Sequence, residues 1–207
     1  VANGTNGGTE DPDTVLKDVN PPHSARIITK AVENNVRAAG GLNIGVLEAL
    51  KYQSDWIGQI QSSVVINKRW LETMRSKANS STAHGIGGRL TYEKHTDIIW
   101  ADGHFLTEGR ILNLRFKRQL NDPGDDPNRW TFPCLSAALF SAKTVQLINN
   151  KYGNFVTEQL PHYGDCMDVA LRFANLGYRD FLHVSEALGT KRGPSLRNVD
   201  VMCCQLL

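Results

Sequence analysis

The chain has 207 residues, enough for one domain with a sizeable buried core, or for one domain with a small appendage. Hydrophobic residues make up 41% and charged residues 21%, which is ordinary for a globular protein and unlike a disordered or fibrous one. Its 23 basic and 21 acidic side chains leave a net charge of +2, so we expect no binding to nucleic acid driven by charge.

Targeting segments and metal-binding cysteines are not evident in the sequence. No run of about eighteen or more apolar residues occurs, and no charged segment precedes an apolar one at the start. We therefore expect no membrane span and a cytoplasmic protein. The four cysteines match no zinc-binding spacing, and the adjacent pair is poorly placed for a disulfide, so we expect reduced thiols. They are Cys134, Cys166, Cys203 and Cys204.

The first third of the chain contains one ambiguous element and two clearer ones. Residues 1–23 are rich in Gly, Asp, Asn, Thr and Pro and are typical of a loop. Residues 24–39 fit either a capped helix or a short buried strand. Apolar residues at helical spacing predict a helix over 41–52, and a run of β-branched residues predicts a strand with an edge turn over 56–66.

The remaining sequence continues to alternate between the two kinds of element. We predict helices over 67–78, 141–149 and 165–177, and strands over 89–92, 96–100, 111–116 and 178–184. Three glycines predict a turn around 85–88, residues 120–129 are loop-like, and residues from Gly189 onward are predicted to be a tail. The alternation indicates an α/β domain with a mainly parallel sheet flanked by helices.

Four segments, in order, share a pattern with a known family. They are VANGTNGGT (1–9); NVRAAGGLNIG (35–45); the stretch from Asp55 through IQSSV (60–64) to WL (70–71); and CLSAALF, YGNF, YGDCMDVALR and GYR between 134 and 179. These segments resemble the VDNGSTDGT, NxGFAGGxNxG, DYILFLNPDVxxxxxWL and GAxLFxR…GxFDE…YxEDxDLxxR…GYR motifs of the family 2 glycosyltransferases.

The resemblance implies a single GT-A domain, with a Rossmann-like mixed and mainly parallel sheet, spanning 1–207 and including a tail over 189–207. It implies transfer of a sugar, with inversion, from a nucleoside diphosphate donor to a hydroxyl of a glycan or protein acceptor. The alternative is a GT-A-like pseudoenzyme, a binding or structural module within a larger assembly with other protein chains.

The resemblance also assigns roles to individual residues. Asp165 matches the aspartate that acts as general base, which is the group that takes the acceptor's proton. It also directly precedes a predicted helix and is suited to capping it. The matching donor-binding residues are Asn3, Gly4, Asn35, Arg37, Asn43, Gln61, Ser63 and Lys191. His162 and Asp168 are placed near the acceptor, and Asp168 is also spaced to pair with Arg172.

The chain departs from the family at the carboxylates that contact nucleotide and metal. The family implies a divalent cation, Mn²⁺ or Mg²⁺, but its Asp-x-Asp pair is replaced by Gln61 and Ser63, which are poor ligands for such ions. The other replacements are Ala2, Gly7 and Gly164 for acidic residues, Lys191 for a histidine and Arg37 for a glycine. Either Lys191, Arg192 and Arg37 neutralise the diphosphate without metal, or transfer has been lost. Lys191 and Arg192 are otherwise a solvated pair.

Two further expectations concern an additional strand and two tryptophans. The family has a strand before its first motif, near the middle of the sheet, so we expect either that the sequence is a fragment or that another chain supplies this strand. Trp100 and Trp130 are either packed in the core or form a platform for stacking a sugar.

Overall fold

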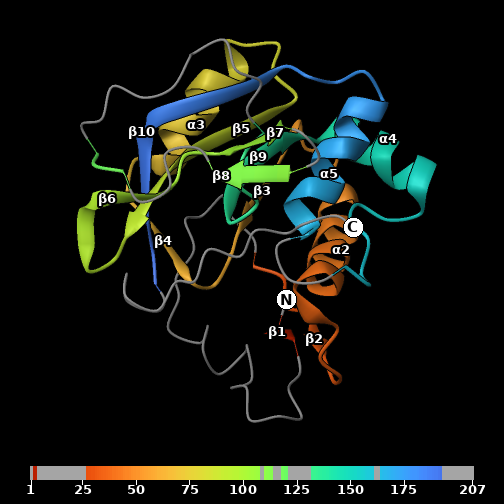
Figure 1. Ribbon diagram of the computed structural model, residues 1–207. Helices are drawn as coiled ribbons and strands as arrows, with labels where there is room; N and C mark the ends of the chain where they lie inside the picture. The colour runs from red at the N-terminus through yellow and green to blue at the C-terminus, as the bar shows by residue number, and fades with distance from the viewer. Residues whose placement is uncertain are drawn as a thin grey trace.

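The computed structural model describes residues 2–3, 27–107, 110–113, 118–120, 132–160 and 164–192, with only the backbone at 2–3, 106–107 and 110–113. The described chain is a mixed α/β structure with a central sheet and four helices (Figure 1). The helices are α2 (Arg37–Leu50), α3 (Trp70–Asn79), α4 (Ala142–Tyr152) and α5 (Gly164–Asn175). The strands are β1 (Ala2–Asn3), β2 (Ala31–Val32), β3 (Trp56–Ile60), β4 (Val64–Ile66), β5 (Gly85–Tyr92), β6 (His95–Ala101), β7 (His104–Thr107), β8 (Arg110–Asn113), β9 (Ala137–Ser141) and β10 (Phe181–Lys191).

The main sheet has six strands in the order β3-β9-β5-β10-β4, with β6 paired to β5. Only β5 and β10 are parallel; every other pairing in this sheet is antiparallel. The prediction of a mainly parallel sheet is therefore wrong. It assumed a crossover helix between successive strands, whereas β5 turns directly back into β6, and β9 runs antiparallel to both of its neighbours.

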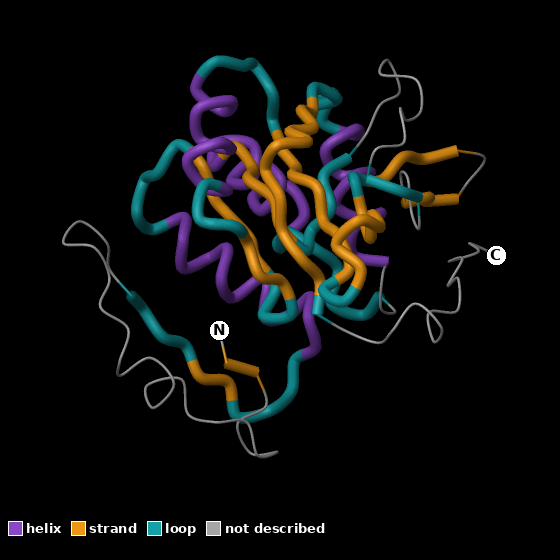
Figure 2. Tube along the Cα trace, turned by 90° about the vertical axis from the view of Figure 1, so that its left-hand side faces the viewer, coloured by secondary structure: helices purple, strands orange, loops and turns teal. Residues whose placement is uncertain are grey.

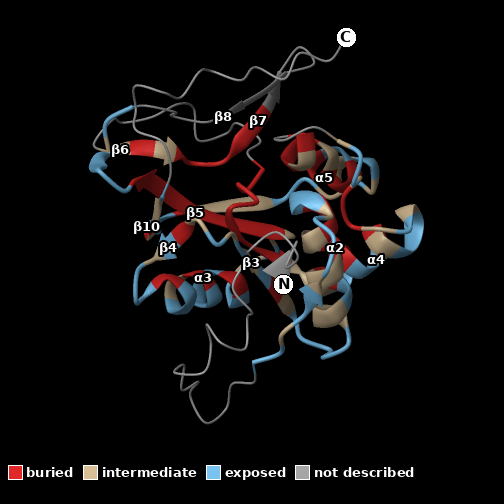
Figure 3. Cartoon of the chain, turned by 90° about the horizontal axis from the view of Figure 1, so that it is seen from below, coloured by how far each residue is buried: buried red, intermediate tan, exposed pale blue. Residues whose placement is uncertain are grey.

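Alternation along β9 explains how the sheet is covered on both faces. Ala138 and Phe140 face an apolar cluster under α2, α4 and α5, whereas Ala137 and Leu139 face a second cluster under α3. Successive side chains of a strand point to opposite faces, so a strand buried on both sides has a continuous apolar sequence. Figure 3 shows the resulting arrangement, with buried strands between helices whose outer surfaces are exposed.

The glycines of β5 are packing residues and not turn residues. The prediction of a turn around 85–88 is wrong, because all of β5 is buried strand. A Cβ on Gly88 would lie 2.3 Å from the carbonyl oxygen of Ala187 and 2.9 Å from the indole nitrogen of Trp70. A Cβ on Gly85 would lie 3.0 Å from the rings of Phe140 and Phe181. Close packing on both faces therefore requires glycine here.

The last described strand continues further than expected. The tail predicted from Gly189 onward is wrong up to Lys191, because β10 runs to that residue and pairs with two strands at once. Lys191 is opposite Tyr92 of β5 on one side and Val64 of β4 on the other. Because the strand at Lys191 pairs with a neighbouring strand on each side, the position of the Lys191 backbone is fixed.

The predicted helices are confirmed, with shifted ends. The first begins at Arg37 and resolves the ambiguity over 24–39 in part, because residues 31–32 are a strand and 37–39 already belong to α2. Helix α5 packs through Val169, Ala170 and Phe173, as its periodicity predicts. In the described part of the chain, no helix combines the length and apolar character that crossing a bilayer requires.

The short strands β1 and β2 form a separate parallel pair, apart from the main sheet (Figure 2). Strand β3, at the end of the main sheet, pairs with β9 on one side. Among the described strands, none pairs with its other side. This open edge is next to the pocket described below.

Candidate functional site

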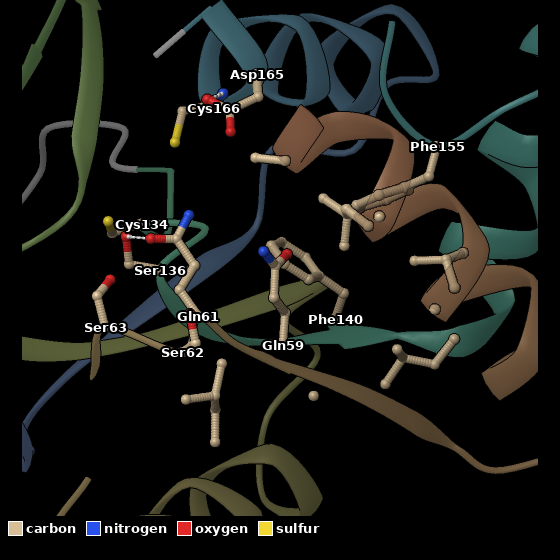
Figure 4. Close-up of a pocket in the computed structure, with 18 of the residues that line it drawn as sticks. Gln59, Gln61, Ser62, Ser63, Cys134, Ser136, Phe140, Phe155, Asp165 and Cys166 are labelled. Carbon is tan, nitrogen blue, oxygen red and sulfur yellow. Dashed lines mark hydrogen bonds between the residues drawn. The ribbon is translucent and has the colours of Figure 1, made fainter. Parts of the chain in front are cut away.

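One pocket brings together several of the residues that the sequence analysis names. Its volume is about 770 Å³. One wall is α2, which contributes the small residues Gly41 and Gly45; another is β3 with the turn that follows it. Figure 4 shows the pocket, with Asp165 at the start of α5 on the far side from Gln61 and Ser63.

One end of the pocket is polar and contains the side chain of Lys191. Its ammonium donates hydrogen bonds to the Oε1 atom of Gln61, at 2.9 Å, and to the Oγ atom of Ser63. Gln61 is held in turn by the Ser136 hydroxyl, which donates to the same Oε1 at 2.9 Å. Lys191 thus bridges Gln61 and Ser63, the two residues that the motif resemblance aligns with Asp-x-Asp.

Partial burial makes this ammonium unusual. Burial lowers the pKa of Lys191, and attraction to Cys134 partly opposes this effect. The ammonium also lies over the ring of Trp100, with Nζ 5.1 Å from the ring centroid. Trp100 lines the pocket, so its ring is both packed and presented to the cavity. A half-buried cation with neutral partners is well suited to binding an anion.

Asp165 lies at the opposite side of the pocket, in the first turn of α5. Its Oδ1 atom accepts a hydrogen bond from the backbone N–H of Cys166, at 2.9 Å. The positive end of the helix dipole also favours a carboxylate at this position. Asp165 therefore lies within the first turn of α5, after Gly164, and not at the capping position before the helix, and it lines the pocket.

Arg37 is exposed and contributes to the pocket rim from the first residue of α2. Its backbone adopts a φ of 62°, in the left-handed region. The Oδ1 atom of Asn35 accepts a hydrogen bond from the Arg37 backbone N–H, at 2.8 Å, and stabilises this turn. Left-handed backbone strongly favours glycine, which is the residue that the resembled motif has here.

This geometry gives a testable contrast between two substitutions of Arg37. We expect Arg37→Gly to be more stable than Arg37→Ala by about 1 kcal/mol, because glycine relieves the left-handed strain while both remove the guanidinium. Urea unfolding of the two variants checks this expectation. Equal midpoints and slopes would contradict the strained backbone.

Two predicted donor-binding residues lie elsewhere. Asn43 is buried, and its side-chain amide bonds to the backbone of Phe155 and Val156 and to Glu158, which joins α2 to the segment after α4. Neither Asn43 nor Asn35 lines the pocket. Asn43 thus holds the wall of the pocket in place.

Asp168 has the structural role that its spacing predicts. Its Oδ2 atom accepts hydrogen bonds from Nε of Arg172, at 2.9 Å, and from the backbone N–H of Thr157, at 2.7 Å. Three other assigned residues cannot be placed. His162 and Gly4 lie outside the described residues, and Asn3 is described only by its backbone.

Three pocket residues were not assigned to a site from the sequence. Cys134, Cys166 and His104 all line the cavity, from a loop, α5 and β7. They lie in three separate segments of the chain, and none of the motif positions given a functional role is one of these residues. Only the fold brings them together.

The residues at the polar end do not fit a divalent cation. Mn²⁺ and Mg²⁺ prefer carboxylate oxygens, whereas Gln61 and Ser63 are neutral and already bind the Lys191 ammonium. Among the described side chains, no group of three or more His, Cys, Asp and Glu residues is arranged to hold a metal ion.

Comparison with known proteins gives no family for this chain. No protein-family model matches it, and no curated protein matches it significantly in sequence. What supports a function is therefore the pocket itself and the motif resemblance.

Proposed function

We propose that this chain is a GT-A-like domain of the family 2 glycosyltransferase type, and that its pocket binds a nucleoside diphosphate sugar without a metal ion. One observation carries the proposal: the Lys191 ammonium bridges Gln61 and Ser63, the two positions where the resembled family holds its cation. A fixed ammonium supplies positive charge at that point, and charge is what a departing diphosphate requires.

The opposite side of the pocket supports a transfer reaction. Asp165 is positioned at the cavity as a general base that takes a proton from an acceptor hydroxyl. The oxygen of that hydroxyl then bonds to the sugar's anomeric carbon, on the face opposite the diphosphate, and the bond to the diphosphate breaks. Lys191 stabilises the negative charge that develops on the leaving group. A base and a cation on opposite sides of one cavity are what an inverting displacement needs.

The walls of the pocket are consistent with this ligand. Gly41 and Gly45 on α2 allow close approach to the backbone, which suits a nucleotide. The apolar end, which includes Val46 and Ile57, lies along the open edge of β3. We propose that the additional strand implied by the resemblance pairs with the open edge of β3 and covers this end. The polar end would then be the ligand site.

A second candidate function is binding without transfer, as a structural or regulatory module. It is favoured by the replacement of both Asp-x-Asp carboxylates, which leaves Lys191 satisfied by the protein's own oxygens. The two functions share the ligand and differ only in the role of Asp165.

Calorimetric titration with nucleoside diphosphates and their sugars, in a chelator and then in manganese, tests the proposal. We expect binding in the chelator that Lys191→Met weakens by about tenfold to a hundredfold, because a charge-assisted hydrogen bond is lost. Arg192→Ala is the matched control, since it removes the neighbouring charge, which pairs with Glu93 and does not line the pocket.

Two outcomes would overturn the proposal. The first is binding that requires manganese, which would mean that a metal site exists despite the donor set. The second is a folded chain that binds none of these ligands under either condition. Equal losses of binding affinity in Lys191→Met and Arg192→Ala would show that only the overall positive potential of the surface contributes to binding.

A further inference from the structure

Lys191 differs from the other lysines that the structure describes, because its side chain is half-buried and lines the pocket. The others are exposed to water, and Lys30, Lys51 and Lys77 also form ion pairs with glutamates. Water and carboxylates both stabilise an ammonium, and a lysine that stays protonated is a poor nucleophile. Burial reduces the first of these influences at Lys191. The exposed lysines are Lys30, Lys51, Lys68, Lys77, Lys94, Lys143 and Lys151.

The oxygens that bind Lys191 are neutral and suit either protonation state of its amine. Among the described residues, they are the Oε1 atom of Gln61, at 2.9 Å from Nζ, and the Oγ atom of Ser63. The ammonium donates to both of these oxygens. When Nζ is neutral, it can still donate to Gln61, while the Ser63 hydroxyl turns and donates to the lone pair of Nζ. Loss of the proton therefore leaves both hydrogen bonds in place.

The pKa of Lys191 follows from the same surroundings. Burial has the largest effect and lowers the pKa, and attraction to Cys134 opposes it. At a given pH, a larger fraction of Lys191 than of an exposed lysine is therefore neutral. Only the neutral amine can attack a carbonyl carbon.

The Nζ atom is held in place beside an aromatic surface. The strand that carries Lys191 pairs with β4 and with β5 at this residue. Nζ lies 5.1 Å from the centroid of the Trp100 ring, which also lines the pocket. A carbon atom bonded to Nζ would lie close to this ring, so a planar group on that carbon can stack against it.

We propose that Lys191 is a site of covalent attachment for a planar aldehyde, which enters the pocket and forms an imine with Nζ. The pocket, of about 770 Å³, has room for a small aromatic ring beside Trp100. The inference does not depend on the proposed transferase function, and no metal ion takes part in it.

The chemistry is a condensation in two steps. The ammonium releases a proton to solvent, and neutral Nζ attacks the carbonyl carbon. A carbon–nitrogen bond forms, and the carbonyl oxygen gains a proton as the nitrogen loses one, which gives a carbinolamine. The carbon–oxygen bond then breaks; the Ser63 hydroxyl, next to Nζ, gives a proton to the departing hydroxyl and recovers the proton that the nitrogen loses. In balance, an amine and an aldehyde give an imine and water, and nothing is oxidised or reduced.

The full chain, kept native and treated with benzaldehyde and cyanoborohydride, tests the inference. The reductant converts the imine to a stable benzylamine, after which trypsin no longer cleaves. Modified Lys191 therefore appears in peptide 180–192, and modified Lys94 in peptide 90–110. Lys94 is exposed and is the internal standard. We expect the ratio of the modification rates, Lys191 to Lys94, to be at least about fivefold higher in native chain than in urea-unfolded chain.

Two comparisons test the class of ligand and the role of the pocket. Propanal has no ring to stack on Trp100, so we expect it to give an enrichment at Lys191 at least about twofold smaller than benzaldehyde gives. Arg192→Lys is the matched control, because Arg192 is the next residue, is exposed and does not line the pocket. Fragmentation of the peptide assigns the label, and the new lysine is expected to react no faster than Lys94.

The wild-type result alone decides whether Lys191 is a reactive amine, even if the variant fails to fold. An equal ratio in native and unfolded chain, or a lower one in native chain, would overturn the inference. Equal enrichment with propanal and benzaldehyde would overturn the planar class of ligand. Enrichment of the lysine introduced by Arg192→Lys to the same extent as Lys191 would place the cause outside the pocket, and would overturn the inference as well.

Discussion

Replacing Asp102 with asparagine is expected to lower the free energy of unfolding by about 3–5 kcal/mol, the usual effect of breaking a buried ion pair. Asp102 is fully buried in the loop between β6 and β7. Its two carboxylate oxygens accept hydrogen bonds from Nε and Nη2 of Arg89, at 2.8 and 2.9 Å, and one also contacts Nε2 of His183, at 2.9 Å. Removing the carboxylate would leave the Arg89 guanidinium buried without its counter-ion.

The same cluster predicts how stability depends on pH. Burial by itself would raise the pKa of Asp102, but hydrogen bonds from His183 and Arg89 outweigh it, so the pKa is lowered. A depressed carboxylate pKa contributes stability above the unfolded value, about 4, and this contribution is lost as pH falls through the folded value. We therefore expect the difference between wild type and Asp102→Asn to be full at neutral pH and to shrink in acid.

Urea unfolding of both proteins from pH 7 to pH 3 measures these quantities. Glu93→Gln is the matched control, because Glu93 forms an exposed ion pair with Arg192 and its loss is expected to change the unfolding free energy by less than about 1 kcal/mol. A small and pH-independent effect of Asp102→Asn would contradict the role given to this cluster.

The second large effect concerns Asp165. If the chain transfers sugar as we propose, Asp165→Asn is expected to reduce the rate of transfer by about a hundredfold to ten-thousandfold, since the general base is lost. Donor affinity is expected to change by less than about threefold, because the diphosphate contacts lie at Lys191, on the other side of the pocket. Transfer kinetics and calorimetry on one preparation separate the two quantities.

Asp180→Asn is the control for this experiment, because Asp180 is exposed and lies outside the pocket. A wild-type chain that binds the donor but transfers to no acceptor would favour the non-catalytic module. Transfer that survives Asp165→Asn unchanged would remove Asp165 from the mechanism.

How far the sequence predicts this molecule depends on whether a feature is local. The periodicity of residues 165–177 predicts α5, because the spacing of apolar residues depends only on the helix itself. The glycines at 85–88 suggest a turn locally, yet contacts with Ala187, Trp70 and Phe140 make them strand residues. Neither the strand directions nor the end of β10 could be derived from local patterns, since both depend on which strands pair.

For the candidate site, too, the sequence predicts which residues belong to motifs but not which of them contact one another. Asp165, Arg37, Gln61, Ser63 and Lys191 could be picked out because each stands at a position in a motif. Their contacts could not: the bridge from Lys191 to Gln61 and Ser63 requires β10 to extend beyond Gly189. Cys134, Cys166 and His104 line the same pocket but come from three separate segments, so only the folded chain shows that they belong to it.

The bridging ammonium of Lys191 has a consequence for where such a protein could work. A metal cation binds from solution. A site that depends on it is therefore occupied only when the concentration of the free ion is high and that of competing ions is low. Lys191 is part of the polypeptide and cannot be withdrawn by a chelator or exchanged for the wrong ion. Its backbone is anchored between β4 and β5, so the charge is supplied once per chain at synthesis. Such a pocket would keep its positive charge where the concentration of free divalent ions is low or variable.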